Sequence, residues 1–248
     1  MLSSARRQYV ESQQIAALGL SQARRNAGRG SVAVAGVVGR YQAAAAFLAL
    51  EYAPLVLNEQ GIDAASSGRV AVESLLTGSA AVGLLEAAET RAAFDRLVLS
   101  LIADAGRTAA SVDLATRPAV SGYVRSLNPP SCSRCAVLAG RVYRYSTGFQ
   151  RHPKCDCLMT PTNEAVGQSL VTQPTGDQIR GLSAADRAAV GAGADLSQVV
   201  NVRRKEAGLN VGSSVLERAG RPTPAGIYAI ASDKAGALTL FRRFGYVL

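Results

Sequence analysis

The chain has 248 residues, enough for one large domain or two modest ones, and it can bury a substantial core without covalent cross-links. Hydrophobic residues make up 48% of the chain, aromatic residues 5%, and tryptophan is absent, a composition closer to helical packing than to a β-sandwich. The formal net charge of +9 at pH 7 favours an anionic partner, such as nucleic acid, an acidic protein surface or lipid headgroups.

The first third of the chain predicts neither an export signal nor a membrane span. Arg6 and Arg7 stand where a secretory signal needs an apolar core. The most apolar stretch, 31–57, contains Arg40 and Glu51, whereas a membrane helix needs about 20 predominantly apolar residues. We therefore expect a protein without membrane contact, made in a reducing cytoplasm.

The amino-terminal half predicts a succession of helices rich in alanine and leucine. Apolar residues between 86 and 107, among them Phe94, Leu101 and Ala105, recur at intervals of three and four, which places them on one helical face. Further helices are expected at 5–26, 34–57 and about 64–77, separated by breaker runs at 26–30 and 58–63. Residues 1–116 should form a helical bundle or an elongated helical arm.

The composition changes near residue 117, where the alanine-rich pattern gives way to shorter elements. Alternating patterns predict strands at 123–127, 141–145 and 157–160, with a short helix at 131–140 between the first two. Residues 117–163 are therefore expected to form a small α+β module.

The remainder, 164–248, is expected to hold a linker and a helical tail. The polar, glycine-rich stretch 162–181 predicts the linker. Several residues mark the ends of the helices that follow: Ser183 with Asp186, Thr223 before Pro224, Ser232, and finally Arg242, Arg243 and Gly245. The predicted fold class is mainly α, with a small module stabilised by cysteine and histidine.

All four cysteines and the single histidine of the chain lie between residues 132 and 157. In order they are Cys132, Cys135, His152, Cys155 and Cys157. The two-residue gap in the first pair is half of a tetrahedral zinc site, and 19 residues separate Cys135 from Cys155, within the spacing of a structural zinc ribbon. Four of these five residues are predicted to bind a structural zinc ion, and the spacing does not choose among them.

Three other interpretations of this segment remain open. Two disulfides between the early and the late cysteines would form outside a reducing compartment, and the cysteines can also be simple buried thiols. A Cys132 or Cys135 nucleophile with His152 as base is a third, but no oxyanion loop or orienting group accompanies it. We therefore predict no enzymatic activity.

Basic residues gather around the cysteine and histidine segment and recur later in the chain. The candidates for contact with phosphate or with an acidic partner are Arg141, Arg144, Arg151, Lys154, Arg203, Arg204 and Lys205. A solvated surface explains the same cluster without any partner.

Two runs resemble the phage Mu F-like head morphogenesis domain, a family that pairs a CxxC and a glycine turn with a later HPxCxC. These runs are 128–143 and 151–157, and both occur in the family's order. Segments 192–201 and 243–246 are similar to minor capsid proteins of tailed phages that infect actinobacteria.

This resemblance implies a structural minor capsid protein of a tailed phage or prophage, made in the host cytoplasm and placed at the portal vertex and capsid interior. Its implied partners are the portal protein, the major capsid protein and packaged DNA, within a symmetric assembly of several copies. The alternative is a zinc-knuckle protein that binds nucleic acid in the host, for which affinity for DNA should fall steeply with salt.

Overall fold

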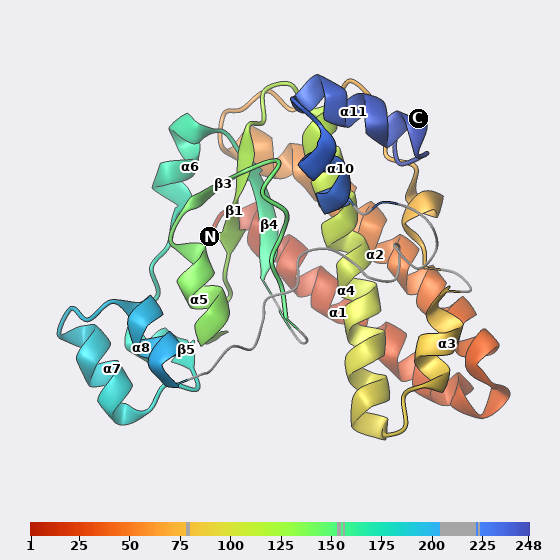
Figure 1. Ribbon diagram of the computed structural model, residues 1–248, viewed down its shortest axis with the longest axis horizontal. Coiled ribbons are helices and arrows are strands. Elements are labelled where there is room, and N and C mark those ends of the chain that lie inside the picture. The colour runs from red at the N-terminus through yellow and green to blue at the C-terminus, as the bar shows by residue number, and fades with distance from the viewer. Residues whose placement is uncertain (78–79, 153–154, 156, 204–221, 223) are drawn as a thin grey trace.

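A computed structural model describes residues 1–77, 80–152, 155, 157–203, 222 and 224–248, and it confirms a mainly helical fold with a small sheet (Figure 1). The helices are α1 (Ser3–Asn26), α2 (Ser31–Glu59), α3 (Ala80–Glu86), α4 (Arg91–Thr116), α5 (Ser133–Ala139), α6 (Glu164–Leu170), α7 (Ala184–Gly191), α8 (Leu196–Arg203), α10 (Pro224–Ile230) and α11 (Lys234–Arg243). The strands are β1 (Gly122–Ser126), β2 (Ser131–Cys132), β3 (Val142–Arg144), β4 (Leu158–Thr162) and β5 (Ile179–Arg180).

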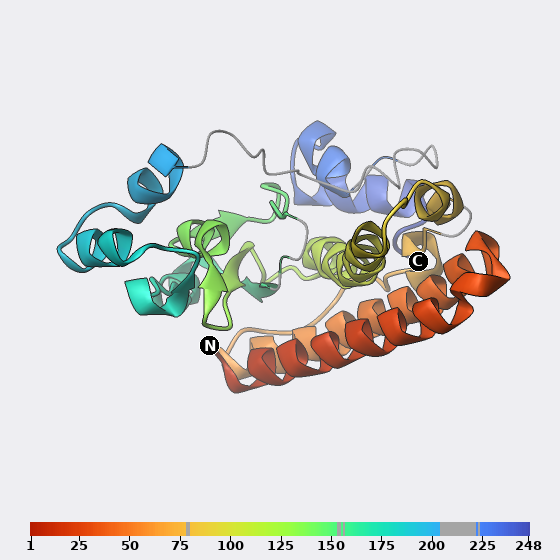
Figure 2. The same ribbon diagram turned by 90° about the horizontal axis from the view of Figure 1, so that it is seen from below.

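Helices α1 and α2 form a long antiparallel hairpin that makes one outer layer of the molecule (Figure 2). Its open end is held by Glu59, whose carboxylate accepts the backbone N–H groups of Ser3 at 2.7 Å and Ser4 at 2.9 Å. These hydrogen bonds, led by the one from the Ser4 hydroxyl, lower the pKa of Glu59 to about 2. The side chain thus supplies the acceptor that the first N–H groups of α1 lack.

Helix α4 packs against both members of the hairpin and carries their shared core. The predicted helix at 86–107 is confirmed in type, but it begins at Arg91, where the Thr90 hydroxyl accepts the N–H of Ala93 at 3.1 Å. Buried Gln42 of α2 donates to the backbone oxygen of Leu101 at 3.1 Å, which joins the two helices by a polar contact inside the core.

Gly19 marks the closest approach of α1 to its neighbours. A Cβ atom there would lie 2.4 Å from Ile102 Cδ1 and 2.9 Å from Tyr41 Cγ. We expect Gly19→Ala to lower the free energy of unfolding by about 1–3 kcal/mol, because overpacking outweighs the gain in helix propensity. Urea unfolding measures it. The control Gly83→Ala in α3, with open space around its Cβ, should be neutral or stabilising, and equal stabilities of the two variants would contradict this packing.

The helix predicted at 64–77 is wrong. Residues 64–71 are extended or turn-like, and only Val72–Leu75 form a short 3-10 helix. The carboxyl terminus provides the competing hydrogen bonds, since Ala71 N donates to Tyr246 O at 2.8 Å and Leu248 N donates to Arg69 O at 2.7 Å. This pairing joins residues far apart in sequence and replaces the local helical pattern.

The last two helices lie on α2 and α4 and share their core, so they do not project as a separate tail (Figure 1). Tyr228 of α10 and Phe241 of α11 are buried there with ring centroids 5.1 Å apart. The Arg242 and Arg243 ending is confirmed.

The structure confirms some of the predicted helix ends and corrects others. Gly245 has a φ of 73°, as predicted beyond the end of α11. The capping box of Ser183 and Asp186 is confirmed at the start of α7. The cap predicted at Ser232 is wrong by one residue, because Asp233 accepts the N–H of Gly236 at 2.7 Å. Thr223 lies outside the described residues.

The three predicted strands are confirmed and form one antiparallel sheet in the order β3-β1-β4. Tyr123 of β1 lies opposite Tyr143 of β3, and the two rings stack with centroids 5.1 Å apart. The linker predicted at 162–181 is wrong in large part. Asn163 caps α6 within it, and β5 pairs in parallel with β2.

Among the described residues, α2 alone is long and apolar enough to cross a membrane, with a mean hydropathy of 1.4 in its most apolar window. Half of that window is buried inside the protein. A core helix has the same properties.

Candidate metal centre

The five predicted ligands come from two segments that meet beside β1. Cys132 ends β2 and caps α5, where its sulfur accepts the N–H of Cys135 at 3.4 Å. Cys135 itself lies in the first turn of α5. His152, Cys155 and Cys157 come from the segment that precedes β4. A turn of helix and the approach to a strand therefore bring the two halves of the sequence pattern together.

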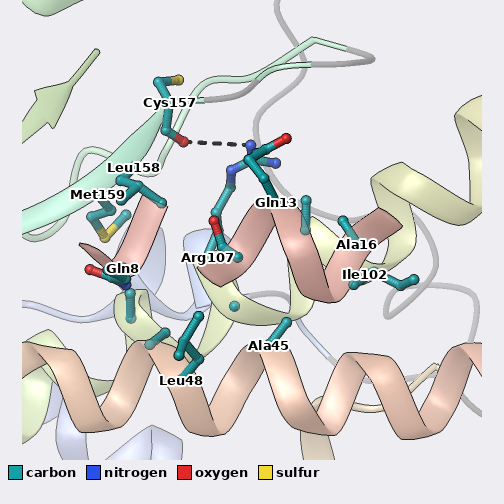
Figure 3. Close-up of a pocket in the computed structure, with 15 residues that line it drawn as sticks. Gln8, Gln13, Ala16, Ala45, Leu48, Ile102, Arg107, Cys157, Leu158 and Met159 are labelled. Atoms are coloured by element: carbon teal, nitrogen blue, oxygen red, sulfur yellow. Dashed lines mark hydrogen bonds between the residues drawn. The ribbon is translucent and has the colours of Figure 1, made fainter. Parts of the chain in front are cut away.

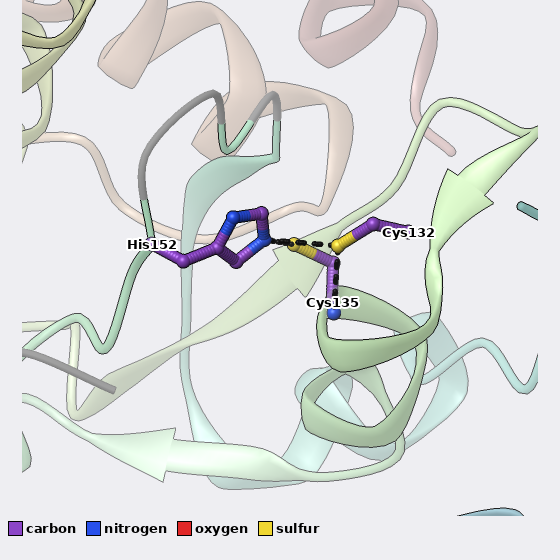
Figure 4. Close-up of side chains that lie close together, drawn as sticks. All are labelled: Cys132, Cys135 and His152. Atoms are coloured by element: carbon purple, nitrogen blue, oxygen red, sulfur yellow. Dashed lines mark hydrogen bonds between the residues drawn. The ribbon is translucent and has the colours of Figure 1, made fainter. Parts of the chain in front are cut away.

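Cys135 is the common member of two groups of ligand atoms, each of which can hold a metal ion. In the first, His152 Nε2 lies 2.9 Å from Cys132 Sγ and 3.4 Å from Cys135 Sγ (Figure 4). In the second, Cys135 Sγ lies 3.5 Å from both Cys155 Sγ and Cys157 Sγ. All five residues lie close together and can bind a metal.

The distances around Cys135 fit tetrahedral zinc. Zinc bonds of about 2.3 Å to sulfur and 2.0–2.1 Å to nitrogen place neighbouring ligand atoms roughly 3.5–3.8 Å apart. The Cys155 and Cys157 sulfurs are 2.8 Å apart, shorter than this edge but longer than the roughly 2.05 Å of a disulfide. All four cysteines are free in this structure.

A buried arginine lies directly under the thiols. Arg125 of β1 is 2% exposed, and its Nη1 lies 2.6 Å from Cys157 Sγ and 3.8 Å from Cys155 Sγ. Its guanidinium also stacks on Phe149, with Cζ 4.0 Å from the ring centroid, and donates to the backbone oxygen of Gln150. Burial opposes the charge of Arg125, but its interactions with the cysteine sulfurs, first of all Cys157, outweigh burial and raise the pKa of Arg125.

Two further arginines and one carboxylate extend this frame. Arg107 of α4 donates to the backbone oxygens of Cys155 and Cys157, the latter at 3.5 Å. Asp104 of the same helix pairs with Arg107 at 3.2 Å and with Arg151 at 2.8 Å. The frame fastens the cysteine segment to α4 and surrounds the sulfurs with positive charge.

The thiols divide into two kinds. Hydrogen bonds from Cys135 lower the pKa of both Cys132 and Cys155, with smaller contributions from His152 and Cys157 respectively. Sharing its proton with these sulfurs raises the pKa of Cys135, and burial raises that of Cys157. A thiolate is the form that binds metal, so zinc binding would release the remaining thiol protons of this cluster.

The basic residues predicted as partner contacts lie in different surroundings from one another. Arg151 is paired with Asp104 and its side chain is 19% exposed, so it belongs to the frame of the site, and its role as a phosphate contact stays a prediction. Arg141 precedes β3 and Arg144 ends it, both are exposed, and Arg141 stacks on Tyr143 with Cζ 4.9 Å from the ring centroid. Arg203 ends α8, and its side chain, like Lys154, Arg204 and Lys205, lies outside the described part of the chain.

Three functional residues were not predicted from sequence: Arg125, Arg107 and Asp104. The sequence did hold a sign of Arg125: it is a charged residue in the middle of a predicted strand, on the same face as the apolar residues Tyr123 and Leu127. Asp104 and Arg107 looked like the polar side of a helix, and no local pattern marks their partners 47 to 50 residues away.

A small cavity lies between α1, α2, α4 and the start of β4, beside the metal centre (Figure 3). Its volume is about 50 Å³, and Arg107, Cys157 and Met159 lie in its wall. Ligand pockets for small molecules measure about 300–1,000 Å³. This cavity has room for water rather than for a substrate.

Comparisons with known proteins identify no relative of this chain. No protein-family model matches the chain. No curated protein and no solved structure matches it significantly.

Proposed function

We propose that the chain is a structural minor capsid or head morphogenesis protein of a tailed phage, and that its cysteine and histidine centre holds a structural zinc ion. The observation that carries the proposal is the meeting of the CxxC half and the HPxCxC half, in the order of the Mu F-like pattern, at one point of the fold. The proposed place in the virion is the portal vertex and the capsid interior.

Zinc would act here as a cross-link. Four of the five ligands would bind it, joining the β2 and α5 segment to the segment that leads into β4. Around them Arg125 and Arg107 offset the negative charge of several thiolates. This chemistry supports a structural site, because saturation by protein ligands leaves no open position for a substrate.

The proposed partners are the portal protein, the major capsid protein and packaged DNA. The net charge of +9 suits either an acidic protein surface or DNA. Arg141 and Arg144 are the members of the predicted basic set that the structure describes as exposed.

The direct test is mass spectrometry of purified particles from the phage that encodes the chain, together with co-expression of the chain and that phage's portal protein. We expect the chain in mature heads and a complex with the portal that survives gel filtration. Normal, infectious particles assembled without the chain would contradict the proposal.

A DNA-binding titration separates this function from a zinc-knuckle role in the host. If the chain is structural and contacts packaged DNA only non-specifically, its affinity for duplex DNA should be weak at physiological salt, because non-specific phosphate contacts are screened there. Sub-micromolar binding with a steep salt dependence would favour the alternative.

A further inference from the structure

Helix α2 carries an outward stripe that the described residues of the chain leave exposed. Val32 is 73% exposed, Phe47 53% and Leu55 46%, although large apolar side chains of this kind are usually buried. Arg40 and Glu51 are exposed between them, on the same side of the helix. The stripe runs for about 35 Å along α2 at the helical rise per residue.

The order of residues along this stripe is self-complementary. Consider a second copy of α2 that lies antiparallel to the first, with a two-fold axis between Ala45 and Ala46. Each residue of one copy then faces the residue of the other copy for which the two residue numbers add up to 91. Arg40 then faces Glu51, and Glu51 faces Arg40. Gly36 faces Leu55 and Ala44 faces Phe47, so these two large side chains each meet a small one, while Val32 faces Glu59.

The two charges of the stripe are available for such a contact. Within the described residues, neither Arg40 nor Glu51 takes part in an ion pair or a side-chain hydrogen bond. Opposite charges aligned across an interface fix its register and exclude other alignments.

The neighbouring helix also exposes a large apolar side chain. Leu18 of α1 is 56% exposed and lies near the middle of α2, because α1 runs antiparallel to it with Glu11 bonded to Tyr52 and Ser4 to Glu59. Among the elements that the structure describes, none covers the outer side of the layer formed by α1 and α2 (Figure 2).

We propose that α2 is the contact between two copies of this chain, which form a two-fold symmetric dimer through antiparallel packing of the stripe. The dimer rests on the residues of α2 and is independent of the proposed place in a virion. A contact built on one helix from each copy is at the small end of specific interfaces, so we expect a dissociation constant in the micromolar range.

The test uses charge reversal in the full chain, with sedimentation equilibrium over a range of concentrations. In a dimer of Arg40→Glu, an acidic side chain faces another acidic side chain in both pairs. In a dimer of Glu51→Arg, a basic side chain faces another basic side chain in both pairs. Each single variant should dissociate at least about tenfold more readily than the wild type. An equimolar mixture of the two variants should regain much of this affinity, because its mixed dimer pairs two acidic side chains of one copy with two basic side chains of the other.

Arg96→Glu is the matched control, a reversal at an exposed position of α4 away from the stripe. It should dimerise like the wild type, and thermal unfolding should show that all variants are folded. A wild-type chain that stays monomeric up to about 100 µM, well above the micromolar constants of weak specific contacts, would overturn the proposal. Dimers whose dissociation constant is unchanged by both charge reversals would also overturn it. So would a monomer that binds phosphatidylglycerol vesicles through this stripe in a flotation experiment.

Discussion

Removal of the proposed zinc ion from the reduced protein is expected to unfold the central module while α1, α2 and α4 remain folded. Zinc binding and folding are coupled where ligands come from separate segments, and structural zinc sites contribute about 10–16 kcal/mol of apparent binding energy in small zinc peptides. The helical core holding Val38, Val98 and Ile102 contains none of the ligands, so it should survive this loss.

Hydrogen exchange resolved by mass spectrometry measures this directly. After chelation, peptides from 122–162 should lose protection, and peptides from α2 and α4 should keep most of theirs. A chelator already saturated with zinc is the control and should change nothing. Unaltered protection at 122–162 in a sample shown to be free of metal would contradict a structural role for the ion.

Replacing the buried arginine under the sulfurs is expected to destabilise the protein strongly. Arg125→Met keeps much of the side-chain volume but removes the charge that lies 2.6 Å from Cys157 Sγ. Removing one partner of a buried ion pair costs about 3–5 kcal/mol, because the remaining charge stays buried without compensation. Urea unfolding of the zinc-loaded, reduced protein measures the difference.

Arg144→Met on the neighbouring strand provides the matched control. Arg144 is exposed on β3, so the same substitution there should change stability by no more than about 0.5 kcal/mol. Arg125→Lys should fall between the two, since an ammonium group keeps the charge but cannot stack flat on Phe149. Equal stabilities of Arg125→Met and Arg144→Met would contradict the assignment of Arg125 as the counter-charge of the site.

The helices and the sheet were predictable where local pattern and tertiary packing agree. The apolar repeat through Phe94 and Leu101 predicted most of α4, and the alternation around Tyr123 predicted β1. The helix expected at 64–77 failed because its hydrogen bonds go to Tyr246 and neighbouring residues, contacts that no local pattern reveals.

The candidate site was predictable in its ligands but not in its surroundings. The spacing of Cys132, Cys135 and the later residues predicted one cluster, and the structure places the five close together as two overlapping groups of ligand atoms that share Cys135. The frame of Arg125 and Arg107 depends on how β1 and α4 pack against the cysteine segment. The ion pair of Arg151 with Asp104 was not predicted for the same reason, since Asp104 lies on a helix far away in sequence.

The most direct measurement is metal content and thiol reactivity on freshly purified, full-length protein. Elemental analysis should find one zinc ion per chain, and the four cysteines should react with a thiol reagent only after denaturation in the presence of a chelator. A chain without metal, whether its thiols are all freely reactive or all lost to disulfides, would contradict a structural zinc centre.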